Sequence, residues 1–323
     1  MNNHRFDVVS LGELLIDFTQ YGVSDQGNLV FEANPGGAPA NVLSMLCRLG
    51  KKTMFIGKVG NDGFGNQLEA ALKEVGICTD GLKKDDEVHT TLALVHKLEN
   101  GDRDFSFYRK PGADMMLRAE EVEEEFLDTA IFHLGSLSLT DQPVKDATLK
   151  ALSLAEKNGC LITFDPNLRE PLWDSLDHAK QEIAFVMGHC QVMKISDNEV
   201  QWFTGLKDYD EGIAKIRKLY PNIRLITLSM GKDGSRAYYD DTRVEVPAFI
   251  SDETVETTGA GDTFCACLLN FVLENGLDGL KEEQLREMLK YGNAAASLIT
   301  RRKGALRVMP TKEEVDSFLR ENG

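Results

Sequence analysis

The stretch VETTGAGDTF (255–264) places a glycine-rich turn at the start of a long apolar segment, TFCACLLNFVLENG (263–276). A helix that begins here presents unpaired backbone N–H groups and the positive end of its dipole. The glycines let an anion approach the backbone without obstruction by Cβ atoms. Asp262 could then accept a proton from an attacking hydroxyl while the N–H groups hold a developing phosphoryl charge. The same pattern also suits an aspartate that only favours the start of the helix.

The chain around this turn alternates between strand-like and helical patterns. Six short runs predict strands, at 6–11, 53–59, 131–137, 160–165, 191–196 and 225–230. Periodic segments between them, at 40–50, 66–76 and 144–159, end in the glycine expected just past a helix. This alternation predicts an α/β fold with a doubly wound, mainly parallel sheet and helices on both faces. Ligands of such folds bind beyond the carboxyl ends of the strands.

Two segments, at about 14–33 and 90–109, break the alternation. The first is strand-like but interrupted by glycines, and the second has a hairpin signal with Asn100-Gly101 as a type I′ turn. We expect both to form a small second sheet inserted into one domain that spans 1–323. This sheet would serve as a lid or as a homodimer contact. The acidic run EEVEEEF (120–126) favours a solvated helix face.

Acidic residues outnumber basic ones by 52 to 36 in this chain of 323 residues, so its net charge is -16. This balance argues against nucleic acid or an anionic membrane surface as a partner. The six cysteines form no CxxC pair and the six histidines no HExxH, so neither a disulfide framework nor a zinc site is indicated. The N-terminal residues lack an apolar signal core, and no stretch approaches 18 apolar residues. We therefore expect a reduced, soluble, cytoplasmic protein.

A second glycine-rich turn, NPGGAPAN (34–41), also leads into a helical pattern. Gly36 and Gly37 would bring the backbone close to a ligand, and Asn41 offers one acceptor and two donors. Asp17, in GELLIDF, would be a bidentate acceptor for two sugar hydroxyls. A plain turn and a carboxylate at a strand end remain the simpler interpretations of these residues.

Two common nucleotide-binding motifs are missing from the sequence. There is no GxxxxGK[ST], so a nucleotide would not be held as in a P-loop. The glycine-rich stretches at 57–63 and 63–68 both miss the GxGxxG spacing. Dinucleotide-dependent oxidoreduction therefore loses its main support.

Taken together, the motifs resemble the PfkB (ribokinase-like) family of carbohydrate kinases over essentially the whole chain. Residues 36–65 look like the N-terminal signature of the family, and TTGAGDTF (257–264) looks like its C-terminal signature. GNAAASLITRRKGA (292–305) looks like the segment that closes the nucleotide site. The resemblance implies a doubly wound α/β domain with a β-sheet lid, which agrees with the separate interpretation of the two inserted segments.

The resemblance also implies roles for individual residues. Asp262 would be the catalytic base. The anion hole would be built by Gly259, Ala260 and Gly261. Contacts to the sugar would come from Asp17, Gly36, Gly37 and Asn41. The nucleotide would be bound by Ser229, Gly231, Gly234 and Asn293, with Asn293 beside the adenine.

Two cation sites are implied in the same way. Glu199 matches the acidic member of the NxxE motif that organises Mg²⁺ and its waters, although Ser196 stands where the asparagine usually is. Glu256 and Thr258 would help bind a monovalent cation, K⁺, which carbonyls around 299–304 would complete. Many relatives have aspartate at the position of Glu256. The alternative is that Glu256 only caps the turn or pairs with Arg301 or Arg302.

Within the family, NPGGAPAN and FDPNLREPLW (164–173) look most like segments of bacterial fructokinases. Arg109 and Arg169 would be cations on the substrate or phosphate side, and a structural salt bridge is the alternative for Arg169. The implied activity is ATP-dependent phosphorylation of D-fructose with Mg²⁺ and K⁺. A 2-keto-3-deoxygluconate kinase is one alternative. A non-catalytic sugar-binding regulator is another, although such a protein would have no need of a base at Asp262.

Overall fold

The computed structural model describes residues 4–97 and 103–322. The strands are β1 Phe6–Leu11, β2 Leu15–Val23, β3 Leu29–Gly36, β4 Thr53–Gly60, β5 Cys78–Asp85, β6 Leu92–Lys97, β7 Arg103–Tyr108, β8 Thr129–Leu134, β9 Leu161–Phe164, β10 Val192–Ser196, β11 Leu225–Ser229, β12 Ser235–Tyr239 and β13 Thr242–Val246. The α-helices are α1 Ala38–Arg48, α2 Gly63–Glu74, α3 Val144–Lys157, α4 Leu176–Met187, α5 Asp197–Thr204, α6 Tyr209–Leu219, α7 Ala260–Asn275, α8 Glu282–Ile299 and α9 Lys312–Asn322.

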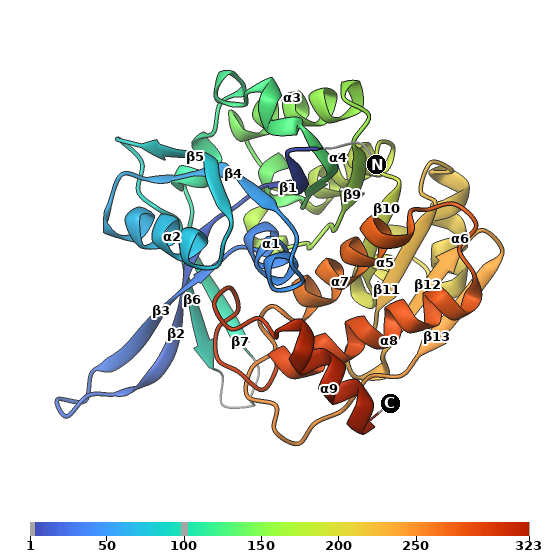
Figure 1. The fold of residues 1–323 in the computed structure, drawn as a ribbon. Coiled ribbons are helices and arrows are strands. Elements are labelled where there is room, and N and C mark those ends of the chain that lie inside the picture. Colours follow the sequence, from blue (N-terminus) through green and yellow to red (C-terminus); the bar gives the residue numbers. More distant parts are fainter. Residues whose placement is uncertain (1–3, 98–102, 323) are drawn as a thin grey trace.

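Nine of the described strands form the central sheet, in the order β13-β12-β11-β10-β9-β8-β1-β4-β5 (Figure 1). Pairing is parallel from β11 to β5, whereas β12 and β13 add an antiparallel edge. Each of the six predicted strands is present in this sheet. The mainly parallel α/β architecture is therefore confirmed.

Helices cover both faces of the central sheet because adjacent residues of each inner strand point to opposite sides. In β1, Val8 packs in a core with α1, α7 and α8, whereas Val9 packs in a second core with α3, α4 and α6. β4 is buried along its whole length, as expected for an inner strand between two helical layers. Because the strands from β11 to β5 are parallel, their carboxyl ends lie on one edge of the sheet.

A separate four-stranded sheet, in the order β3-β2-β6-β7, extends from the body of the molecule (Figure 1). β2 pairs antiparallel with β3 and parallel with β6, and β6 pairs antiparallel with β7. This is the second sheet that the two inserted segments predict, and we call it the lid sheet. The predicted turn at Asn100-Gly101 lies outside the described residues.

Two local predictions need correction. The acidic run 120–126 forms no α-helix but falls on two 3-10 helices, Ala119–Glu121 and Glu124–Leu127. Val122 and Phe126 anchor this stretch in the core while the glutamates at 123–125 stay exposed. The strand predicted at 131–137 is Thr129–Leu134, because the chain turns into a 3-10 helix at Leu137–Leu139.

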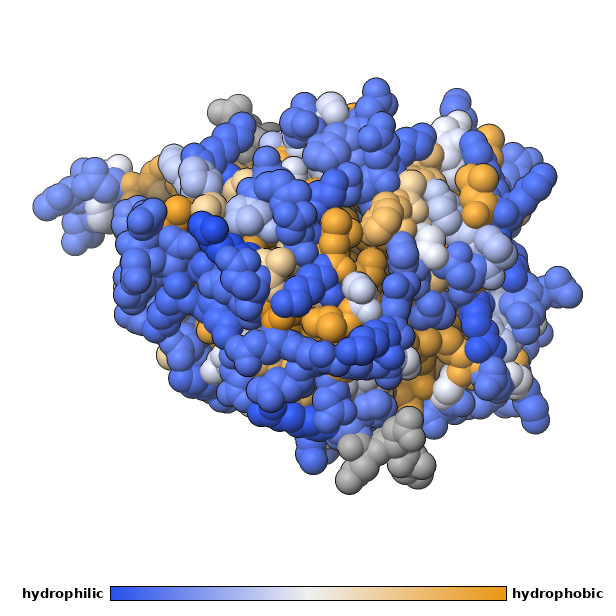
Figure 2. Space-filling model, turned by 90° about the horizontal axis from the view of Figure 1, so that it is seen from above, coloured by the Kyte–Doolittle hydropathy of each residue, from blue (hydrophilic) through white to orange (hydrophobic). Residues whose placement is uncertain are grey.

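On the face shown in Figure 2, hydrophilic residues predominate and hydrophobic residues show mainly in recesses between them. Across the described part of the chain, no helix combines the length and apolar character needed to cross a membrane.

Candidate active site

Two cavities meet at the start of α7. The first, of about 320 Å³, lies between the lid sheet and the carboxyl edge of the central sheet, and Asp17, Asn41, Arg169 and Asp262 line it. The second, of about 380 Å³, lies beside α8. Thr257 and Gly261 line both cavities, so the turn at the start of α7 is a wall that the two cavities share, and we call it their junction. This is the position at which doubly wound folds bind ligands.

The turn is built as the sequence predicts. Gly259 is the N-cap of α7 with a φ of 79°, a left-handed conformation that favours glycine. A Cβ on Gly259 would also lie 2.8 Å from the Cβ of Ala305. Ala260, Gly261 and Asp262 form the first turn of α7, where backbone N–H groups lack carbonyl partners within the helix. The N–H of Ala260, predicted for the anion hole, donates to the Thr257 carbonyl at 3.2 Å, so the N–H groups that remain for a ligand are those of Gly261 and Asp262. An anion at the junction of the cavities would meet these N–H groups and the positive end of the helix dipole.

Asp262 lies on the floor of the first cavity, bound to a residue far away in the sequence. The Nδ2 group of Asn41, in α1, donates a hydrogen bond of 2.8 Å to Oδ2 of Asp262. Burial raises the pKa of Asp262, and this hydrogen bond together with the charge of Lys194 acts in the opposite direction. Asn41 Oδ1 is buried and has no hydrogen-bond partner among the described residues. A ligand hydroxyl in the cavity could satisfy that oxygen.

The lid sheet contributes a second carboxylate to the first cavity. Burial raises the pKa of Asp17 to about 7; Arg169 lowers it, whereas Glu256 and Asp262 raise it further. A Cβ on Gly36, the last residue of β3, would come within 2.3 Å of Asp17 Oδ2. Gly36 therefore leaves room for this carboxylate. Gly37, with a φ of 122°, packs so closely on the Glu13 carbonyl that a Cβ there would clash at 2.4 Å.

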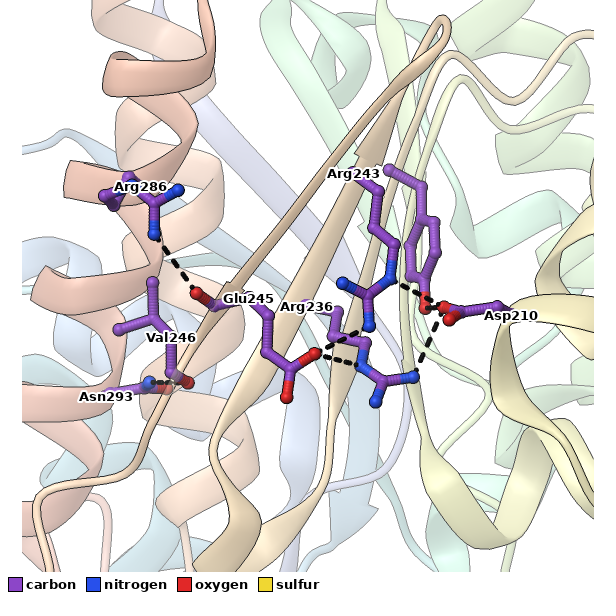
Figure 3. Close-up of polar contacts among 8 residues, drawn as sticks. Asp210, Arg236, Arg243, Glu245, Val246, Arg286 and Asn293 are labelled. Carbon is purple, nitrogen blue, oxygen red and sulfur yellow. Dashed lines mark hydrogen bonds and ion pairs between the residues drawn. The ribbon is translucent and has the colours of Figure 1, made fainter.

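The second cavity is lined by the residues predicted to bind a nucleotide, namely Ser229, Gly231, Gly234 and Asn293. Asn293 lines this cavity, its place beside the adenine stays a prediction, and its side-chain amide is bound to neighbouring residues of the protein. Its Nδ2 donates to the carbonyls of Val246 and Pro247, and its Oδ1 accepts from Ser235 (the Val246 bond is drawn in Figure 3). Asn293 thus fixes the wall between β13 and α8. Ala248, Phe249 and Ala296 supply an apolar surface suited to a flat ring.

Glu199 lies behind the first cavity and does not line it. Its carboxylate accepts from Ser196 N, Ser196 Oγ and Leu168 N at 2.7–2.8 Å. Ser196, which stands in place of the usual asparagine, is thus the N-cap of α5 in a capping box with Glu199. The carboxylate connects β10 with the segment that carries Asn167 and Arg169.

The interpretation of Arg109 as a substrate contact needs correction. Arg109 lines neither cavity, and its buried guanidinium binds Asp114 Oδ2 at 2.7 Å, Thr140 Oγ1 and the Leu137 carbonyl. The buried side chain holds the base of the lid sheet to the body. Arg169, by contrast, lines the first cavity and donates to the carbonyl of its neighbour Leu168.

Glu256 ties the turn before α7 to the loop after α8. Its Oε1 accepts from Thr258 Oγ1 at 2.7 Å, and its Oε2 accepts from Gly304 N at 3.0 Å. Its own backbone N–H donates to the Thr300 carbonyl. Arg301 and Arg302 pair with Glu253 and Glu314. Carboxylate, hydroxyl and carbonyl oxygens that gather here are ligands suited to a hard cation, so the residues fit the implied K⁺.

Within residues 4–97 and 103–322, no group of three or more His, Cys, Asp or Glu side chains is arranged to hold a metal ion. Mg²⁺ is usually bound by one or two carboxylates together with substrate phosphates and water, so it needs no such group. Glu199 and Asp165 are close enough to influence each other electrostatically, but neither lines a cavity. Glu199 accepts three hydrogen bonds and Asp165 is paired with Lys194. The role of Glu199 in organising Mg²⁺ and its waters therefore stays a prediction.

The structure adds two charged residues that the sequence analysis did not identify. Glu13 follows β1, lines the first cavity and accepts from Ala38 N at the start of α1. Burial raises the pKa of Glu13 to about 7. Lys194, in β10, lines the same cavity and forms an ion pair of 2.9 Å with Asp165. A charged residue inside the apolar run QVMKIS was the available signal for Lys194.

The comparisons with known proteins agree with this arrangement. The family model described as pfkB family carbohydrate kinase matches residues 5–312. Probable fructokinase-2 of Arabidopsis thaliana is 40% identical over 316 residues, which are 97% of this chain and 95% of that protein.

Two solved structures are similar over nearly their whole length. Fructokinase with bound ATP from Xylella fastidiosa has 29% identity and a TM-score of 0.87, and the match covers 98% of both chains. Fructokinase of Vibrio cholerae in the form with fructose, ADP and calcium ion has 28% identity and a TM-score of 0.86, over 97% of this chain and 99% of that one. The match to the family model, the similar relatives and the fold with its lid sheet show that this chain belongs to the PfkB family of carbohydrate kinases.

Proposed function

We propose that this protein transfers the γ-phosphoryl group of ATP to the 6-hydroxyl of D-fructose. The observation that carries the proposal is the junction of the two cavities at Gly261. A carboxylate, Asp262, lies on the sugar side of this junction, and the N–H groups of Gly261 and Asp262 in the first turn of α7 adjoin it. A hydroxyl bound beside Asp262 and a phosphate bound at the helix start would meet there. The names of the relatives support fructose as the sugar.

In this proposal Asp262 takes the proton of the 6-hydroxyl as the oxygen attacks the γ-phosphorus, and ADP leaves with the electrons of the broken P–O bond. The N–H groups of the first turn of α7 hold the charge on the phosphoryl oxygens. Asp17 and Asn41 orient the sugar through its other hydroxyls. Mg²⁺, when bound, would neutralise phosphate charge, with Glu199 arranging its waters.

The test is release of ADP in a coupled assay over D-fructose, ribose, glucose and 2-keto-3-deoxygluconate, with identification of the phosphorylated carbon. We expect fructose to have the highest kcat/KM. A tenfold preference for another sugar, which corresponds to about 1.4 kcal/mol of differential transition-state binding, would overturn this choice.

A sugar acid is the second candidate, because of Arg169. Its guanidinium lines the sugar cavity, where a carboxylate of 2-keto-3-deoxygluconate could bind it. The surrounding carboxylates of Glu13, Asp17 and Glu256 line the same cavity and favour a neutral sugar. Arg169→Gln discriminates the two: it should lower kcat/KM for the sugar acid far more than for fructose if the sugar acid is the substrate.

K⁺ and a homodimer complete the proposal. K⁺ would bind beside Glu256 and Thr258. The lid sheet carries large hydrophobic side chains that are more than a third exposed, namely Tyr21, Val23, Leu29, Val30 and Tyr108. Burial of these side chains against a second lid sheet would form the dimer. Sedimentation of the native chain and of Tyr21→Lys should separate dimer from monomer. We propose the cytoplasm as the compartment, since the six cysteines are free.

A further inference from the structure

A buried ion pair lies beneath the turn at the start of α7. Lys194 Nζ lies 2.9 Å from Asp165 Oδ2 and 3.2 Å from Oδ1, and both side chains are less than a tenth exposed. β10, which carries Lys194, runs parallel to β9, which precedes Asp165, so both side chains reach the same edge of the sheet. A buried pair of this kind contributes little net stability, because desolvation offsets the attraction of the charges. The stability of the fold therefore does not by itself account for a lysine here.

The ammonium group is directed toward the junction of the cavities. A Cβ placed on Gly261 would lie 3.3 Å from Lys194 Nζ, so the amine lies next to the turn on the side to which a side chain at 261 would point. Lys194 also lines the sugar cavity, together with Gly259, Gly261 and Asp262. An ammonium has three N–H donors, and Asp165 does not need all of them. At least one can point toward the space between the Asp262 carboxylate and the N–H groups of α7.

A group in that space would carry negative charge during the proposed transfer. As the sugar oxygen bonds to the γ-phosphorus and the bond to ADP breaks, charge spreads over the three equatorial oxygens of the phosphoryl group. Backbone N–H groups offer only partial charges there, whereas Lys194 offers a full positive charge from a side chain that is itself buried. Asp165 restrains the ammonium through the ion pair of 2.9 Å.

We propose that Lys194 is a catalytic residue that donates a hydrogen bond to an equatorial oxygen of the phosphoryl group in transfer, and that Asp165 is its positioning residue. This inference rests on the proposed phosphoryl transfer. It extends that proposal by assigning to a side chain of β10 a task that otherwise falls to backbone and metal alone.

The main test is a cycle of two substitutions. Lys194→Met removes the charge at nearly constant volume, and the double variant Lys194→Met, Asp165→Asn removes the carboxylate that the single change leaves unpaired. We expect the double variant to recover melting temperature relative to Lys194→Met but to retain a loss of 10²–10³ in kcat, the usual effect of losing one such donor. Turnover of the double variant within threefold of the native chain would overturn the proposal, because a purely structural pair would be restored in this way.

A matched control and a second measurement make the test specific. Lys58 in β4 is an equally buried lysine, 2.9 Å from Glu121, and lines neither cavity. Lys58→Met should lower the melting temperature and leave kcat within twofold. Calorimetry should show that Lys194→Met weakens binding of MgADP with aluminium fluoride, a mimic of the phosphoryl group, more than tenfold in the presence of fructose. Binding of MgADP alone should change less than threefold, and equal losses for both ligands would contradict the contact.

The native chain is assayed in parallel on the sugar panel. A native chain that phosphorylates no sugar overturns the proposed function, and the inference with it. An active native chain with an active double variant overturns the inference alone.

Discussion

Replacement of Asp262 by asparagine tests the base directly with little change of shape. Asn41 Nδ2 donates a hydrogen bond of 2.8 Å to Asp262 Oδ2, and the side-chain oxygen of an asparagine at position 262 can accept the same bond. The variant also removes a carboxyl group whose pKa burial has raised, so it relieves a desolvation cost in the folded state. We expect its melting temperature to lie within about 3 °C of the native value, or above it.

Turnover should respond very differently from stability. A general base contributes 10²–10⁴ in rate, which corresponds to about 2.7–5.5 kcal/mol of activation free energy. Asparagine has no site for the proton of the 6-hydroxyl, so kcat for fructose should fall by that factor. The dissociation constant for fructose should change less than fivefold, because Asp17, Asn41 and the cavity walls remain in place.

The rate of ADP release is measured at saturating ATP. In the same samples, calorimetry measures the binding of fructose and thermal melting measures stability. Asp114→Asn is a useful comparison, because Asp114 is a buried carboxylate bound to Arg109 outside both cavities. That change should lower the melting temperature and leave kcat nearly intact. Near-native turnover of Asp262→Asn, in a folded sample that binds fructose, would remove Asp262 from the reaction.

Three further predictions follow from the geometry of the site. Gly261→Ala should fold, since Gly261 is helical. The variant should lower kcat at least tenfold and leave the affinity for fructose within threefold, because the added methyl group occupies the path of the phosphoryl group beside Lys194. Single-turnover kinetics measure the first effect and calorimetry the second. The pKa of Asp17 is raised to about 7 from an ordinary 3.8, so ionisation costs stability in the folded state and unfolding free energy should fall as pH rises from about 4 to about 7. Asp17→Asn should make that fall shallower by the share that Asp17 contributes, which is at most about 4 kcal/mol and smaller in an open cavity, while Glu13, whose pKa is raised in the same way, keeps its own share; denaturant melts across pH measure the difference. K⁺ should activate the native chain less than it activates the Glu256→Asp variant, since glutamate adds a methylene to the reach of the carboxylate. Turnover in K⁺ is compared with turnover in tetramethylammonium at constant ionic strength. Stronger activation of the native chain would refute the geometric argument.

Features that depend only on residues close together in the sequence could be predicted from the sequence. The alternation of apolar strands and periodic helices determines β1, β4 and β8–β11, because each pattern reflects the side-chain period of its own element. Gly259 and Gly37 could be recognised for a similar reason, since close approach and positive φ require glycine at those points. The two inserted segments of the lid sheet could be found because they interrupt this regularity.

Contacts between distant segments depend on strand order and were decided only by the tertiary structure. Asn41 and Asp262 are 221 residues apart, and they meet because α1 and α7 pack on the same face of the sheet. Lys194 and Asp165 meet because β9 and β10 are parallel neighbours, which no property of either strand alone reveals. Arg109 and Asp114 are only five residues apart, yet which way the arginine points depends on how the lid sheet joins the body. The sequence shows which segment carries a charged residue. Which residue of opposite charge it pairs with depends on the free energy of packing the whole sheet.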